Sequence, residues 1–402
     1  MTSEQTSAAR PRLVTRALLL RFVSIVGSAT SFYLLLSVVP LYAQSTGAGG
    51  SAAGLVTGAL MLTTVAGELA TPRLLARFGY RWVAGAGLVL LGAPALALIG
   101  SASMAMITAV CLVRGLGFAV ITVAGGALTA SLIPSERRGE GLALVGVVAG
   151  VPALVALPLG VWLAEHVGFT SVFVAAAVAA LVAVGVVPFL PDVERPAGGE
   201  RREDGVVAGL RTPALVRPSL VFATTAMAAG IVVTFLPLAG ASGGVVALAL
   251  FVQATATTAA RWLAGRYGDR HGSAGLLTPG LVASAAGILL LALGGLAPLA
   301  GTVAVLAGSA LFGAGFGISQ NASLAVMYQR VPRSGYGTVS ALWNTAYDAG
   351  MGVGATGFGV LAAGTGSPAA FGLTAVLMLA ALAPAARDRA VRRSATPLAA
   401  TS

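Results

Sequence analysis

The chain alternates long apolar runs with short polar breaks over most of its length. Charged residues and groups of glycine, proline and serine divide the chain into twelve apolar segments. Each has roughly the 20 residues that cross a bilayer. Open strands leave backbone groups unsatisfied in lipid, so the pattern predicts helices and an all-α integral membrane fold. The segments are residues 17–42, 52–71, 82–100, 104–130, 141–163, 169–190, 218–240, 244–264, 274–296, 301–328, 338–362 and 368–385.

Composition supports a surface that meets lipid. Hydrophobic residues make up 57% of the 402 residues, charged residues only 9%, and the mean hydropathy is +0.92. An ordinary soluble domain is about a quarter charged, so a water-soluble enzyme is excluded. The single cysteine, Cys111, cannot form a disulfide within the chain, and one cysteine with two histidines is too few for a dense metal cluster. We therefore expect no cofactor, no metal and no enzymatic activity.

The basic residues predict which way the segments point. All 24 are arginine, and all but Arg21 and Arg114 fall near the termini or in the breaks after even-numbered segments. Positive charge in short loops marks the cytoplasmic side of a membrane protein. We therefore expect a multi-pass protein of a bacterial inner membrane with both termini in the cytoplasm. Nucleic-acid binding needs a clustered basic patch, which this distribution does not provide.

One hydrophilic stretch, residues 191–217, divides the segments into two groups of six. It predicts a cytoplasmic linker between two six-helix halves. The expected organisation is a cytoplasmic tail at 1–16, a first half at 17–190, the linker at 191–217, a second half at 218–386 and a cytoplasmic tail at 387–402.

The two halves carry an internal repeat. Val39-Pro40-Leu41 is echoed by Leu236-Pro237-Leu238, and Arg77-Phe78-Gly79 is echoed by Arg270-His271-Gly272. Each echo lies at the same place within its half and in the same orientation. Two such parallel, pseudo-symmetric halves are typical of secondary transporters, whose substrate sites lie between them near the bilayer midplane.

Several motifs resemble those of the major facilitator superfamily. The stretch from Gly265 to Gly272, with Asp269 and Arg270, is similar to its signature loop Gly-x-x-x-Asp-Arg-x-Gly, whereas the first copy has Ala76 in place of the aspartate. Arg114 matches the arginine of the family's fourth-segment motif. The resemblance implies the twelve-helix fold of that family and a gating role for Asp269 and Arg270.

A further motif points to one branch of that family. Gly146-x-x-x-Gly150-Val151-Pro152 is similar to the glycine and proline motif of drug/proton antiporters, with Val151 between the glycine and Pro152 that usually adjoin. The resemblance therefore implies efflux coupled to protons.

Asp348 is a candidate proton carrier. It lies about ten residues, ~15 Å at the helical rise, inside its segment. Ser340, Asn344 and Asp348 share one helix face because they are spaced i, i+4. An ionised carboxylate at the bilayer centre costs about 3 kcal/mol, so a group there is suited to taking up and releasing a proton. The alternative is a structural aspartate that pairs with an arginine or caps a broken helix.

Two more charged residues have alternative roles. Arg114 either binds an anionic group, or promotes proton release from a nearby carboxylate, or forms a fixed ion pair between helices. Glu68 lies near the cytoplasmic end of segment 52–71, which adjoins segment 338–362 in the fold that the resemblance implies. We expect it to face the positive N-terminal end of that helix as a gate contact in place of Ala76; snorkelling to the interface is the alternative.

Uncharged polar residues within the segments are candidate substrate contacts, because they are costly in lipid and should face a cavity or one another. They are Ser31, Tyr33, Gln253, Gln320, Asn321, Ser340 and Asn344.

The expected function is secondary active transport by alternating access, without ATP because no phosphate-binding loop with a Gly-Lys-Ser/Thr ending occurs. The preferred mode is proton-coupled efflux of a small amphiphilic or drug-like molecule. Uptake of a sugar or organic anion by symport or uniport is the alternative, followed by a non-transporting sensor. The expected partners are the substrate, protons and the bilayer, and the protein is expected to act as a monomer.

Overall fold

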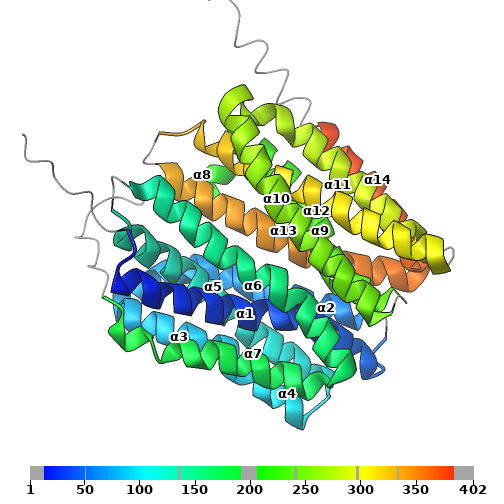
Figure 1. Cartoon of the computed structure of the whole chain (residues 1–402), viewed down its shortest axis with the longest axis horizontal. Coiled ribbons are helices and arrows are strands. Elements are labelled where there is room, and N and C mark those ends of the chain that lie inside the picture. The colour runs from blue at the N-terminus through cyan, green and yellow to red at the C-terminus, as the bar shows by residue number, and fades with distance from the viewer. Residues whose placement is uncertain are drawn as a thin grey trace, which may run out of the picture.

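The computed structural model describes residues 13–49, 51–134, 137–191, 206–239, 242–295, 298–332 and 335–383, and every regular element within them is helical (Figure 1). The expected tail at 387–402, residues 1–12 of the expected N-terminal tail and residues 192–205 of the expected linker lie outside the described residues.

The first half comprises the helices up to residue 189. They are α1 (Arg16–Ser45), α2 (Ala52–Phe78), α3 (Tyr80–Gly92), η1 (Ala93–Leu96), α4 (Ala97–Gly100), α5 (Met104–Leu132), α6 (Arg138–His166), α7 (Phe169–Val184) and η3 (Val187–Phe189). The run from α3 through η1 to α4 forms one membrane span, Tyr80–Gly100.

The second half follows the short helix α8 (Val206–Leu210). Its helices are α9 (Pro213–Phe235), η4 (Leu236–Leu238), α10 (Gly243–His271), η5 (Ser273–Leu276), α11 (Leu277–Ala292), η6 (Leu293–Gly295), α12 (Pro298–Tyr328), α13 (Tyr336–Thr365) and α14 (Ser367–Ala380).

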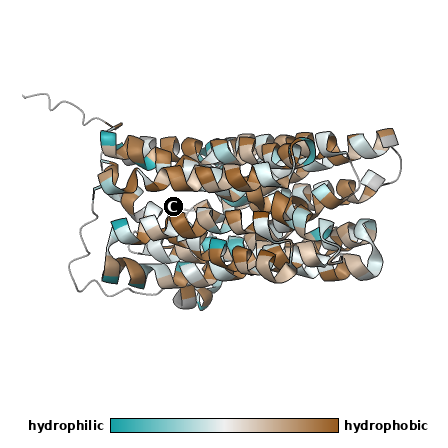
Figure 2. Cartoon of the chain, turned by 90° about the horizontal axis from the view of Figure 1, so that it is seen from below, coloured by the Kyte–Doolittle hydropathy of each residue, from teal (hydrophilic) through white to brown (hydrophobic). Residues whose placement is uncertain are grey.

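Twelve spanning helices result from these elements. Ten helices or helix runs in the described part of the chain are long and apolar enough to cross a membrane. The eleventh, α13, has 30 residues but is more polar because it carries Asn344 and Asp348. The twelfth, α14, is apolar with 14 residues. These helices confirm the predicted all-α integral membrane fold. Apolar residues cover most of the bundle's length (Figure 2), and side chains such as Leu62 and Val353 are exposed where lipid would surround them.

The two halves repeat one another in the backbone. In Figure 1 the first half, blue to green, lies beside the second, yellow-green to red. α2 packs on α5 and α1 on α6, as α10 packs on α12 and α9 on α13. Gly79 ends α2 at φ +77°, and Gly272 ends α10 at φ +84°. A residue with a Cβ is strained there, so the same turn requires glycine in both halves.

Two helices run further than the hydropathy pattern predicts. α2 continues through Pro72 to Phe78, and α10 continues past residue 264 to His271. Proline and charged residues indicate the end of an apolar segment, but a helix that emerges from lipid keeps its backbone hydrogen bonds while its polar side chains are hydrated. Glu68 and Arg261 therefore lie about ten residues, ~15 Å, inside their helices.

The halves meet toward one end of the bundle. We call this the distal end, where α1 ends and α2 begins; the opposite end is proximal. The Thr57 and Thr234 hydroxyls share a hydrogen bond of 3.0 Å between α2 and α9. Gly54 lies directly against the Ala355 backbone of α13, where a Cβ would collide. Close contact of two helices at small residues is the usual way to join them without a hydrophobic driving force.

Candidate functional site

A pair of carboxyl groups joins the two halves near mid-depth. Asp348 of α13 is 3% exposed and Glu68 of α2 is 9% exposed. Their carboxyl groups lie within hydrogen-bonding reach of each other. Because α2 belongs to the first half and α13 to the second, this contact joins the two halves.

The pair needs a proton to be stable. Asp348 Oδ1 and Glu68 Oε1 are buried and have no hydrogen-bond partner in the described part of the chain. Two ionised carboxylates side by side repel, and neither can donate. With one proton between them, one carboxyl group donates to the other, and the two groups titrate as a unit.

The position of Glu68 differs from the sequence-based expectation. It faces Asp348, about two fifths of the way into α13, instead of the N-terminal end of that helix at Tyr336. The reason is the extension of α2 through Pro72, which puts Glu68 deeper than a segment ending at residue 71 allows.

Three further side chains surround the pair. Tyr33 of α1 and Tyr347 of α13 are each within electrostatic range of both Asp348 and Arg261 of α10. The structure thus brings together Asp348, Glu68 and Tyr33 from the sequence-based candidates. Helices α1, α2, α10 and α13, from both halves, converge on this place.

An aromatic wall adjoins Tyr347. Its ring centroid lies 5.9 Å from that of Phe222, 6.2 Å from that of Phe316 and 6.3 Å from that of Trp343, all nearly parallel. Phe222 and Phe316 are buried, 0% and 5% exposed, whereas Trp343 and Tyr347 are half-buried. The open parts of the Trp343 and Tyr347 rings are suited to the apolar body of an amphiphilic molecule.

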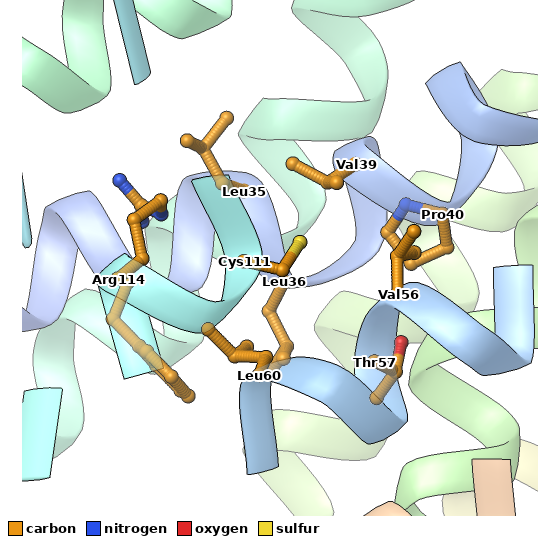
Figure 3. Close-up of a pocket in the computed structure, with 10 residues that line it drawn as sticks. Leu35, Leu36, Val39, Pro40, Val56, Thr57, Leu60, Cys111 and Arg114 are labelled. Atoms are coloured by element: carbon orange, nitrogen blue, oxygen red, sulfur yellow. The ribbon is translucent and has the colours of Figure 1, made fainter. Parts of the chain in front are cut away.

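Arg114 is held away from this pair. Its side chain, 2% exposed, donates from Nη2 to the Ser31 carbonyl oxygen at 2.9 Å and from Nη1 to the Leu91 carbonyl oxygen. It lies at one end of a small pocket whose other end is formed by Pro40 and Thr57 (Figure 3). Among the described residues no carboxylate forms an ion pair with it, so the ion pair considered from the sequence is not seen. Arg114 instead ties α1 and α3 to α5.

The remaining polar candidates lie in several places. Ser340 shares a 2.7 Å hydrogen bond with the Tyr328 hydroxyl, and Asn321 packs on Gly265 between α12 and α10. Ser31 is fully buried beside Arg114, and Gln253 is 7% exposed with a buried Oε1 that has no partner among the described residues. Gln320 and Asn344 are half-buried, and their side chains form no hydrogen bond with a described residue.

The family-motif residues occupy helices. Asp269 and Arg270 lie in the last turn of α10, both exposed, and not in a loop as the signature was interpreted. Gly146, Gly150 and Pro152 lie within α6. Open space surrounds the positions where Cβ atoms on Gly146 and Gly150 would lie.

Arg261 is a residue that the sequence interpretation missed. It was counted with the arginines outside the membrane, but it lies inside α10 and reaches the charges near Asp348. The internal repeat contains a signal that could have found it: the offset that relates Arg77-Phe78-Gly79 to Arg270-His271-Gly272 also relates Glu68 to Arg261.

Two six-helix halves that meet at a buried titratable pair define a membrane transporter. The family model of the Major Facilitator Superfamily matches residues 21–355 and, in a second match, 219–401, so the chain belongs to this superfamily. It is therefore a multi-pass membrane transporter that binds a small molecule. No curated protein matches the sequence.

Solved structures share the fold. The nucleoside transporter NupG, 13% identical, aligns over 94% of this chain and 99% of its own with a TM-score of 0.72. A bacterial homologue of the human lysosomal transporter Spinster, in an inward-facing and unoccupied conformation, is 15% identical and aligns over 92% of this chain and 96% of its own with a TM-score of 0.68. At such identities the likeness concerns the fold alone.

Proposed function

We propose that the protein exports a small amphiphilic molecule in exchange for protons across a bacterial inner membrane, with its proximal end and termini in the cytoplasm. The observation that carries the proposal is the Glu68–Asp348 pair between the halves. The arginines near the proximal end support the orientation. The motif at Gly146, Gly150 and Pro152 supports efflux.

The shared proton holds α2 against α13. In the present conformation the halves are in close contact at the distal end, so the substrate is proposed to reach the site from the proximal, cytoplasmic side. Loss of the proton to that side leaves two charges in contact, and their repulsion drives the halves toward the opposite arrangement. The pair then takes a proton from the outside, and its hydrogen bond restores the present conformation.

The exchange depends on the protonation state in which the Glu68–Asp348 pair binds substrate. The substrate enters as the proton leaves, and the loaded protein turns outward. A proton that moves inward down ~100 mV releases about 2.3 kcal/mol from the membrane potential alone, which drives the cycle in one direction. Tyr33 and Tyr347 are the titratable groups near Asp348, and Arg261 is within electrostatic range of both tyrosines. Asp269 and Arg270, on the last turn of α10, are proposed gate residues at the proximal end.

Liposomes with an imposed pH gradient test the proposal. Amphiphilic drugs, sugars and organic anions are screened for accumulation driven by an inside-acidic or an outside-acidic gradient; the direction distinguishes export from uptake by symport. Asp348→Asn and Glu68→Gln should abolish the response to the gradient. Glu165→Gln is the matched control, because Glu165 is a carboxylate of α6 away from the pair. Gradient-driven transport that survives both Asp348→Asn and Glu68→Gln refutes the proposal.

A further inference from the structure

Arg261 is a cation within α10, a candidate membrane span. It lies about ten residues, ~15 Å, from the proximal end of α10. The structure shows no hydrogen bond or ion pair of its side chain with any described residue, and the side chain is exposed. Arginine at the centre of a membrane helix costs about 2.5–3.5 kcal/mol, so it normally faces a partner or a water-filled cavity.

The side chain belongs to the space between the halves. Arg261 is within electrostatic range of Tyr33, which lies in the other half, and of Tyr347 on α13. A residue that pointed into lipid from the outer face of α10 would not approach both. We conclude that the guanidinium faces the space between the two halves, next to the tyrosines that lie near Asp348.

In the internal repeat, the α6–α10 contact corresponds to the α2–α13 contact that holds the carboxyl pair. Arg261 occupies in α10 the position that Glu68 occupies in α2. A third echo relates Gly117-Phe118 to Gly315-Phe316, and its offset relates Gly150 of α6 to Asp348 of α13. The α2–α13 contact thus has two carboxyl groups, whereas the α6–α10 contact has one guanidinium and a glycine with open space before it. Among the described residues, the α6–α10 side therefore combines room with a cation that has no ion-pair partner.

We infer that the cavity binds a zwitterionic substrate, whose acidic group lies on Arg261 and whose ammonium group replaces the proton at Glu68 and Asp348. This inference rests on the proposed proton exchange and adds the substrate class. Guanidinium binds carboxylate or phosphonate groups in a bidentate manner, and the Tyr33 and Tyr347 hydroxyls can donate to the same anion. The half-buried ring of Trp343, which stacks on the buried Phe222, receives the apolar body.

The exchange balances in charge. The pair with one proton carries one negative charge; when the proton leaves for the solvent and an ammonium group binds, the site has the same net charge. An ammonium group is larger than a proton and fits between the two carboxylates only when they move apart, so the loaded pair still separates α2 from α13. The acidic group of the substrate at the same time neutralises Arg261. A substrate with only an anionic group would favour retention of the proton, which corresponds to symport, and one with only a cationic group would leave Arg261 unpaired.

Three probes with one aromatic body separate these cases: phenylalanine, phenethylamine and 3-phenylpropionate. Their binding to the full-length protein in detergent is followed by the fluorescence of Trp343, with a Trp343→Phe variant to assign the signal. We expect phenylalanine to bind most tightly. Arg261→Gln should weaken phenylalanine about 10- to 100-fold, the cost of a lost charge-assisted contact, and leave phenethylamine unchanged. Arg266→Gln is the matched control, because Arg266 of the same helix stacks on Trp262 instead.

Two results overturn the inference. One is equal affinity of Arg261→Gln and the wild type for phenylalanine; the other is tighter binding of phenethylamine or 3-phenylpropionate than of phenylalanine to the wild type. The proposed proton exchange fails separately, through unchanged gradient-driven transport in Asp348→Asn, so the two failures are distinguishable.

Discussion

The shared proton between Glu68 and Asp348 should set which end of the transporter is closed. Two unit charges ~4 Å apart repel by about 4 kcal/mol at an effective dielectric constant of roughly 20. Removal of the proton therefore disfavours the present conformation by about that amount, close to a 1,000-fold change in the ratio of the two conformations. The distal end is therefore closed at low pH, where the proton is present, and opens as the pH rises and the proton leaves.

Accessibility of the distal contact measures this shift. Thr57 is buried there by α9, so Thr57→Cys in a Cys111→Ser background should react slowly with a membrane-impermeant maleimide at low pH and quickly at high pH. Loss of the Thr57–Thr234 hydrogen bond should change the labelling rate by the same factor at every pH. In the added Asp348→Asn variant the side-chain amide donates a hydrogen bond to Glu68 whether or not the pair holds a proton. The reaction should therefore stay slow at every pH. The reasoning is refuted if labelling does not depend on pH, or depends on it equally with Asp348→Asn.

Two further substitutions test the packing. Gly54→Ala puts a Cβ into the Ala355 backbone, and overpacking of about 1–3 kcal/mol should open the distal end, so that Thr57→Cys is labelled faster at low pH; unchanged labelling would contradict this contact. Arg114→Gln should leave the Ser31 or Leu91 carbonyl oxygen without its donor, which costs about 1–3 kcal/mol and lowers the thermal unfolding midpoint in detergent. An unchanged midpoint together with lost proton coupling would instead assign Arg114 to the transport chemistry.

Helix spans were predictable from local composition. Lipid excludes charge and requires each backbone donor and acceptor to be paired within its segment, so a run of apolar residues predicts a helix without knowledge of its neighbours. The two halves were predictable for a similar reason: echoes such as Gly79 and Gly272 mark turns that only glycine forms easily. Helix ends were not predictable in this way, since Pro72 and Arg261 are compatible with a helix once its end is hydrated.

The sequence by itself thus determined the membrane fold, the number of spans and the presence of deep charged residues. Only the tertiary structure decided which of those residues meet. Glu68 and Asp348 lie in different halves, and their contact depends on the antiparallel packing of α2 on α13. Arg114 and Arg261 are both deep arginines, yet one is bound by backbone carbonyl oxygens and the other faces the cavity. A charge in a membrane acquires its role from the group opposite it, and that group is set by packing between helices distant in the chain.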